Sequence, residues 1–169
     1  MSINLFFLLL VGLLMGMYGY FTPDYTMLDK NKEIPQIELS NFTLYEISQK
    51  GIDRILEGDE GKKFETRYVI TSAKFSDNTK TLFHSIRSDH ADYQNDLLKV
   101  DGNVHYARQD GLEFRSKEGT YDANRSLIQT QGSFVITQQA NRVTGTTLKY
   151  NTKQDTVSAD RVCGIYQLK

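Results

Sequence analysis

The chain has 169 residues, with 20 Lys and Arg against 21 Asp and Glu, which gives a formal net charge of -1. That length suits one modest domain plus an appendage, and the near-neutral, interspersed charge argues against DNA or RNA as a ligand. Pro23 and Pro35 are the only prolines. The rest of the chain can therefore form long, regular strands.

The N-terminal segment is apolar from Ile3 to Phe21 except for Asn4, and no charged side chain precedes Asp24. As a helix it would span roughly 28 Å, enough for the bilayer core. We predict an uncleaved transmembrane helix at residues 1–23. The alternative is a cleaved signal peptide, but the sequence has neither the basic N-terminal region nor the small-residue cleavage site of such a peptide.

Gly12 and Gly16 lie on one face of this predicted helix, a spacing that lets another membrane helix approach closely. The alternative explanation for the two glycines is that glycine is common in membrane helices. Charges flanking the helix do not decide its orientation, because no Lys or Arg precedes it and both signs follow it.

After a polar linker at residues 24–35, short apolar alternations are separated by Gly, Asn and Asp up to residue 169. Leu112–Phe114, Phe134–Ile136 and Leu148–Tyr150 alternate with a period of two, which is typical of strands. The stretch from Leu44 to Leu56 also fits a helical face, but Gly51 and its flanks favour a hairpin. The fold class predicted for residues 36–169 is all-β.

Internal similarity supports this prediction. Tyr93, Tyr121 and Tyr150 are 28 and 29 residues apart, and each precedes a polar turn, a strand, a second turn or bend, and another strand. A unit of two strands cannot close its own core and must stack on its neighbours. We therefore expect a folded-over stack of antiparallel strands with two open ends.

The sequence shows no catalytic or metal-binding pattern. His84, His90 and His105 with Asp89 and Asp92 lack the spacing of a metal site, and alternation along strands would point several of them apart. The chain has neither a P-loop nor a G-x-S-x-G elbow, so we expect no enzyme, cofactor or metal. The lone Cys163 excludes an internal disulfide.

A modification site is a side hypothesis. Asp122-Ala-Asn124-Arg-Ser126 is similar to the extended acceptor sequence of bacterial N-glycosylation and falls on a predicted hairpin turn. N-x-[ST] sequences also arise by chance, as Asn41-Phe-Thr43 illustrates.

The whole layout resembles the LptC family of inner-membrane-anchored lipopolysaccharide-export proteins. No single motif is specific for this family, but the order and spacing of the motifs together are specific. The departure from the family pattern is the lack of basic residues ahead of the anchor, so orientation rests on the resemblance. The features that carry it, besides the anchor, are Gly51 after an initial strand, Leu97-Leu-Lys-Val-Asp-Gly102-Asn-Val104, Asp110-Gly111-Leu112-Glu-Phe114, Thr120-Tyr121-Asp122, the Gly132 strand, Val143-Thr-Gly145-Thr-Thr-Leu148-Lys-Tyr150 and Asp160-Arg-Val162.

The resemblance implies a twisted antiparallel β-jellyroll, an open-ended sandwich, in the periplasm behind one inner-membrane helix. An apolar groove would take lipid A acyl chains from an ATP-driven (ABC) transporter and pass them to a soluble, LptA-like bridge protein. The residues expected along this groove are Phe42, Leu44, Phe75, Phe83, Phe114, Phe134, Tyr150 and Tyr166.

Open ends of a sheet can dock partners by strand addition. We predict that the last strand, Val162–Leu168, pairs with the bridge protein, and that the edge Ile37–Tyr45 pairs with the transporter. The alternative function is an anchored scaffold of envelope assembly whose β core is closed and which binds only proteins. The predicted partner-binding residues are Val162, Gly164, Ile165, Leu168, Gly12 and Gly16.

Overall fold

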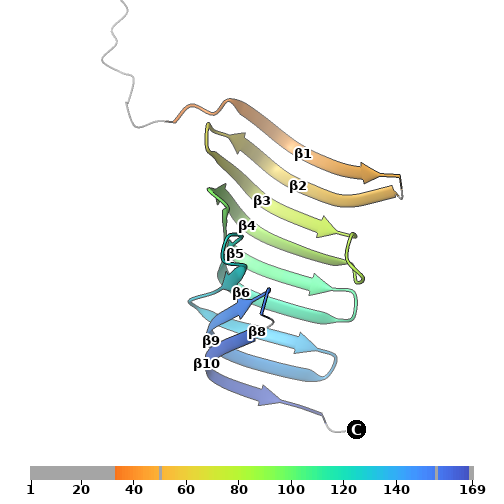
Figure 1. The fold of residues 1–169 in the computed structure, drawn as a ribbon, viewed down its shortest axis with the longest axis vertical. Coiled ribbons are helices and arrows are strands. Elements are labelled where there is room, and N and C mark those ends of the chain that lie inside the picture. Colours follow the sequence, from red (N-terminus) through yellow and green to blue (C-terminus); the bar gives the residue numbers. More distant parts are fainter. Residues whose placement is uncertain (1–32, 50, 155, 168–169) are drawn as a thin grey trace, which may run out of the picture. The chain divides into compact units, whose positions relative to one another are not determined.

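The computed structural model describes residues 33–49, 51–154 and 156–167. Within them, ten strands form one antiparallel sheet (Figure 1). None of these residues belongs to a helix long and apolar enough to cross a bilayer, and the anchor predicted at residues 1–23 lies outside them. The strands are β1 (Ile37–Ser48), β2 (Gly51–Lys63), β3 (Arg67–Asp77), β4 (His84–Gln94), β5 (Leu97–Arg108), β6 (Leu112–Asp122), β7 (Leu127–Gln129), β8 (Ser133–Gln138), β9 (Asn141–Asn151) and β10 (Thr156–Ile165).

The strands follow one another through the sheet in chain order. β7 and β8 both lie between β6 and β9, so together they fill one position, and β1 and β10 are the two edges. The prediction of an all-β antiparallel stack is confirmed. The hairpin between β1 and β2 is also as expected, with Ile47 paired to Ile52 across the turn.

One face of the sheet carries the buried apolar side chains, and we call it the inner face. Ala73, Ala91, Val100 and Val104 form its buried cluster. Because side chains alternate along a strand, cross-strand partners of inward-facing residues also face inward. The inner face is thus a set of rows that run across the strands.

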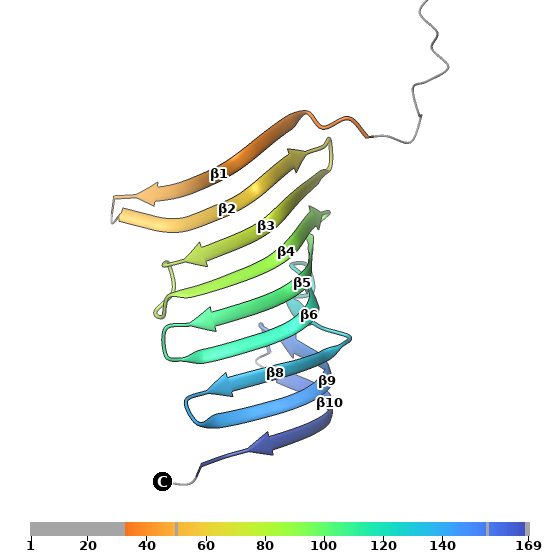
Figure 2. The same ribbon diagram turned by 180° about the vertical axis from the view of Figure 1, so that it is seen from behind.

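The strands bend along a line that we call the corner. Residues with left-handed backbone lie on it in β1, β3, β5, β9 and β10, and β7 and β8 are separated at the same level. A left-handed residue bends the strand and shifts the alternation of the side chains that follow it. The bend is visible in β1 and β2 (Figure 2). The corner residues are Asn41 (φ 47°), Ser72 (φ 54°), Asn103 (φ 50°), Thr147 (φ 55°) and Arg161 (φ 49°).

Burial is deepest beside the corner. Phe134 is only 2 % exposed, and its ring fills the space that a side chain at Gly145 would need. The ring of Phe42 likewise covers Gly58 and Gly61. The hydrophobic core is therefore a narrow strip along the corner, and the inner face beyond it is less buried.

Candidate functional site

A row of large apolar residues crosses the inner face from β1 to β9. Leu44 at the β1 edge is 50 % exposed, and the others are partly buried. The Phe114 ring stacks on that of Phe134 with centroids 6.1 Å apart, which joins this row to the core. We call it the apolar row, and it comprises Leu44, Leu56, Phe75, Ile86, Tyr106, Phe114, Ile136 and Val143.

Six of the eight residues predicted for the groove lie on the inner face. Leu44, Phe75 and Phe114 belong to the apolar row, whereas Phe42 and Phe134 lie beside the corner. Tyr150 lies at the far end of the same face, opposite Ile128. The sheet thus brings these six side chains onto one continuous surface.

The other two predicted residues lie outside the strands. Phe83 precedes β4, where its backbone exchanges hydrogen bonds with Gln109. Tyr166 follows β10, and its ring lies over Gly164, with 66 % of the residue exposed. The last strand runs over Thr156–Ile165, so it starts and ends earlier than the predicted Val162–Leu168.

A second row, at the opposite end of the strands, was missed as a group from the sequence. Tyr68, Tyr93 and Tyr121 in it are 46 %, 40 % and 38 % exposed, and the Tyr68 and Tyr93 rings lie 6.3 Å apart. The sequence feature that could have revealed this row is the 28- and 29-residue spacing of three tyrosines. This tyrosine row comprises Tyr68, Tyr93, Leu98, Tyr121, Ile128 and Tyr150.

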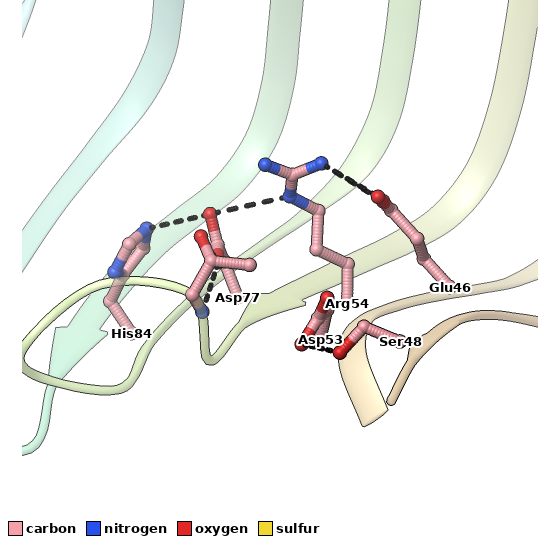
Figure 3. Close-up of polar contacts among 7 residues, drawn as sticks. Glu46, Ser48, Asp53, Arg54, Asp77 and His84 are labelled. Carbon is pink, nitrogen blue, oxygen red and sulfur yellow. Dashed lines mark hydrogen bonds and ion pairs between the residues drawn. The ribbon is translucent and has the colours of Figure 1, made fainter. Parts of the chain in front are cut away.

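Beyond the apolar row, the strand ends carry a polar margin (Figure 3). Arg54 contacts Glu46 at 2.9 Å and Asp77 at 3.6 Å, and His84 lies 3.9 Å from the same Asp77 carboxylate. Further along, Arg108 forms an ion pair with Asp110 at 2.8 Å. Charges on this margin are therefore paired with one another.

Asp77 is the buried member of the polar margin, at 6 % exposure. Burial alone would raise its pKa, but hydrogen bonds from the Thr79 hydroxyl and amide, together with Arg54 and His84, lower the pKa below its ordinary value. The Thr79 hydroxyl lies 2.6 Å and the amide 2.7 Å from Oδ1. The carboxylate stays ionised and fixes the loop after β3 to the start of β2.

Two clefts lie away from the apolar row. The larger, about 610 Å³, is at the turn end of β3 to β6, on the face of the sheet opposite the tyrosine row. The smaller, about 180 Å³, lies over β4, β5 and β6. The larger cleft is lined by Arg67, Asp92, Gln94, Asn95, Leu97, Lys99, Asp122, Asn124 and Arg125.

The three histidines do not converge. The His105 ring donates to the Glu113 carboxylate at 3.2 Å, while His84 is beside Asp77. Among the described residues, no group of three or more His, Cys, Asp or Glu side chains could hold a metal ion. Asn124 is exposed in the turn between β6 and β7, and its amide donates to Asp96 at 3.5 Å.

Both sheet edges expose apolar side chains. On β1, Ile37 and Ile47 are 49 % and 70 % exposed, and on β10, Val157, Val162 and Ile165 are 63 %, 56 % and 66 % exposed. Of the predicted partner-binding residues, Val162, Gly164 and Ile165 thus belong to an edge strand. The remaining ones, Gly12, Gly16 and Leu168, lie outside the described residues.

The chain is similar to a known protein family and to solved structures. A profile of the family "Lipopolysaccharide-assembly, LptC-related" matches residues 7–159. The crystal structure of LptH, the LptA-homologous periplasmic component of the lipopolysaccharide transport device of Pseudomonas aeruginosa, is similar with a TM-score of 0.51. The two chains are 10 % identical, and the match covers 78 % of this chain and 94 % of LptH, so it supports the fold.

No curated protein sequence matches the chain significantly. The family profile nevertheless extends over nearly the whole sequence, from the apolar N-terminal segment into β10. The resemblance seen in the sequence is therefore confirmed: the chain belongs to the LptC-related family, a periplasmic component of the lipopolysaccharide transport machinery.

Proposed function

We propose that the inner face carries the acyl chains of lipid A on their way from an inner-membrane ABC transporter to a soluble periplasmic bridge protein. The observation that supports this function best is the partial exposure of the apolar row along most of the sheet. A protein-binding scaffold needs no such surface, because its apolar residues would be sealed in a closed core. Here the residues that are less than about a tenth exposed lie mainly in the strip beside the corner.

The physical requirement is protection of acyl chains from water. Each methylene removed from water contributes about 0.8 kcal/mol, so a lipid with several chains needs a long apolar surface in an aqueous compartment. The apolar row offers one large side chain on each strand from β1 to β6 and again on β8 and β9. No chemical step is needed, and energy would come from the transporter.

The two edges would make the transfer directional. A sheet edge presents unpaired backbone groups to which a strand of another protein can be added. We assign the β10 edge, with Val162, Gly164 and Ile165, to the bridge protein, and the β1 edge to the transporter. The apolar side chains exposed on both edges would be covered by this docking.

Residues 1–23 would hold the domain at the inner membrane as a single-pass helix with its C-terminal domain in the periplasm. Gly12 and Gly16 would then face the transporter's membrane helices, where glycine permits close approach.

The function can be tested by photo-crosslinking in cells. A photoreactive amino acid at Leu44, Phe75 or Phe114 should form adducts with lipopolysaccharide, while the same amino acid at Lys117 or Lys153 should not. Lys117 and Lys153 are exposed and lie outside the rows of the inner face. If the three apolar sites remain free of lipid while a probe at Ile165 crosslinks to a protein, the carrier role fails and the scaffold role replaces it.

A further inference from the structure

We propose that Asn124 accepts an N-linked oligosaccharide, so that the protein carries a glycan on the turn between β6 and β7. This modification is independent of the proposed carrier function, because it involves neither the inner face nor the sheet edges. Three features support it: the acceptor sequence Asp122-Ala-Asn124-Arg-Ser126, its position in an exposed turn, and the open cleft beside it.

The turn leaves the acceptor side chain accessible. Ala123, Asn124 and Arg125 are all exposed. The Asn124 side chain also lines the larger cleft, about 610 Å³ in volume, so open space adjoins its amide. In the described part of the chain this amide makes one hydrogen bond, to Asp96 Oδ2 at 3.5 Å, which is long for such a bond. An enzyme can therefore reach the amide nitrogen by breaking a single weak contact.

The hydroxyl of Ser126 is also available for recognition. Ser126 is partly exposed, and its hydroxyl has no hydrogen-bond partner among the residues that the structure describes. The turn is instead closed through the Ser126 backbone, whose carbonyl accepts from the Thr152 amide at 2.8 Å. The hydroxyl is thus free to bind a modifying enzyme without disturbing the turn.

An equivalent turn joins β9 to β10 and shows what the fold requires at the first position. Asp122 Oδ1 accepts from the Arg125 amide at 3.0 Å. In the other turn, Asn151 Oδ1 accepts from the Gln154 amide at 2.9 Å, across the same three-residue separation. An oxygen acceptor is therefore sufficient here, and it can belong to a carboxylate or to an amide.

The turn does not explain the other two residues of the acceptor sequence. In the β9–β10 turn, Lys153 stands where Asn124 stands, and Asp155 stands where Ser126 stands. A residue that the turn required for its own geometry would recur in its equivalent. Asn124 and Ser126 instead complete an acceptor for N-linked sugar together with the negative charge two residues before the asparagine.

The position of the glycan is compatible with the rest of the molecule. β6 and β7 are interior strands, so sugars on their turn would cover neither the β1 edge nor the β10 edge. The cleft lies on the face opposite the tyrosine row, and its volume of about 610 Å³ is in the range of small-ligand sites, about 300 to 1,000 Å³. It can hold the first sugars while the inner face stays open.

The modification is a group transfer. The donor is an oligosaccharide linked through its anomeric carbon to a polyprenyl diphosphate, and the catalyst is an oligosaccharyltransferase that faces the periplasm. A bond forms between Asn124 Nδ2 and the anomeric carbon, while the bond from that carbon to the diphosphate oxygen breaks. The polyprenyl diphosphate leaves with the bonding electrons, and one amide proton passes to a base of the transferase.

A second N-x-[ST] sequence in the chain serves as an internal control. Asn41-Phe-Thr43 lies within strand β1, where Thr43 is paired with Glu57 on β2. The residue two positions before Asn41 is Leu39, which carries no charge. Because this sequence is held in the sheet and lacks the acidic residue, we expect Asn41 to stay unmodified.

The test uses the full-length protein, purified in detergent from the cells that naturally produce it. Mass spectrometry of its tryptic peptides should find sugars on the peptide 118–125 and none on the peptide 33–50, which contains Asn41. Asn124→Gln should abolish the added mass. Ser126→Ala should abolish it as well, whereas Ser126→Thr should retain it, because threonine supplies the same hydroxyl.

Asp122→Asn separates recognition by the transferase from folding of the turn. The new asparagine keeps the oxygen acceptor, as Asn151 does in the equivalent turn, but it removes the charge. The ratio of modified to unmodified peptide should fall about tenfold, the effect of one lost charge-assisted hydrogen bond. Asn151→Asp, the reverse change in the equivalent turn, should leave this ratio unchanged. The melting temperature of each variant reports whether its fold is retained.

Each outcome decides the proposal. An unmodified peptide 118–125 in the protein from its native cells would overturn it, and so would an added mass that survives Ser126→Ala. Equal modification of Asn41 would show that exposure in the turn does not select the acceptor. None of these results would affect the carrier function, which crosslinking at the apolar row tests separately.

Discussion

Individual glycines determine how closely the inner face packs. A Cβ atom at Gly58 would lie 2.6 Å from Ile70 Cγ2 and 2.9 Å from the Phe42 ring, so one of these neighbours would have to move. We expect Gly58→Ala to lower the free energy of unfolding by about 1–3 kcal/mol, as overpacking does. Chemical denaturation of the full-length protein would measure this.

Gly132→Ala is the matched control. A Cβ atom at that position meets nothing within 4 Å, so the free energy of unfolding should change by less than about 0.5 kcal/mol. Equal losses in the two variants would mean that Gly58 is not in close contact with Ile70 and Phe42.

Asp77 should make stability depend on pH. Its pKa is lowered in the folded protein, so its stabilising contribution is present above the unfolded pKa of about 3.9 and is lost as pH falls through the folded pKa. Asp77→Asn should cost about 1–2 kcal/mol at neutral pH, from weaker hydrogen bonds with Thr79 and loss of the Arg54 pair. Unfolding curves measured between pH 7 and pH 3 would show this difference shrinking below about pH 4.

Asp101→Asn serves as the control for that experiment. Asp101 is exposed on β5, and removing its charge should change the unfolding free energy little at either pH. If the difference in unfolding free energy between wild type and Asp77→Asn stays constant down to pH 3, this result would contradict the role assigned to the Asp77 charge.

At the scale of elements, the corner is built from strained residues. Thr147 is β-branched and has a φ of 55°, a conformation that such residues rarely adopt. Thr147→Gly should release this strain and, after the entropy cost of glycine, raise the free energy of unfolding by about 0.5–1 kcal/mol. Thr146→Gly should instead lower it by about 1 kcal/mol, because Thr146 is in ordinary strand conformation and bonds Asp160 O at 3.3 Å. Thermal unfolding of both variants checks the sign.

Strands and their pairing could be read from the sequence, but the rows could not. The tyrosine repeat predicted two strands per unit, and Tyr93, Tyr121 and Tyr150 indeed lie near the ends of β4, β6 and β9. Which side chains share a row depends, however, on the left-handed residues at the corner. In β1, Leu39 and Phe42 both face inward although they are three residues apart, because left-handed Asn41 shifts the alternation.

The same shift explains the partial prediction of the candidate site. The large aromatic residues Phe75 and Phe114 were expected along the groove that the resemblance implies, and both lie on the inner face. Tyr68, Tyr93 and Tyr121 were not placed on that face, because strand ends give no alternation long enough to assign a side. Their common row emerges only from the register of four strand pairs.

At the scale of the whole molecule, the β10 edge should govern binding of the bridge protein. Ile165→Lys places a charge on an apolar side chain that docking would cover, and we expect about tenfold weaker binding, equivalent to about 1.4 kcal/mol. Ile34→Lys makes the same change ahead of β1, at the other edge, and should leave this interaction unchanged. Binding of a soluble LptA-like protein to each full-length variant tests the assignment, and equal losses would reject it.

The sharing of one sheet position by β7 and β8 has a topological consequence. It leaves nine strand positions in the described sheet, an odd number, so β1 and β10 run in the same direction (Figure 1). Consider a neighbouring domain that also has an odd number of strand positions. If its first strand pairs with β10 in parallel, its own tyrosine row continues the tyrosine row of this domain. Antiparallel addition would join tyrosines to the polar margin instead. Chain direction at the edge would thus decide whether successive domains form one continuous track for the lipid or a broken one.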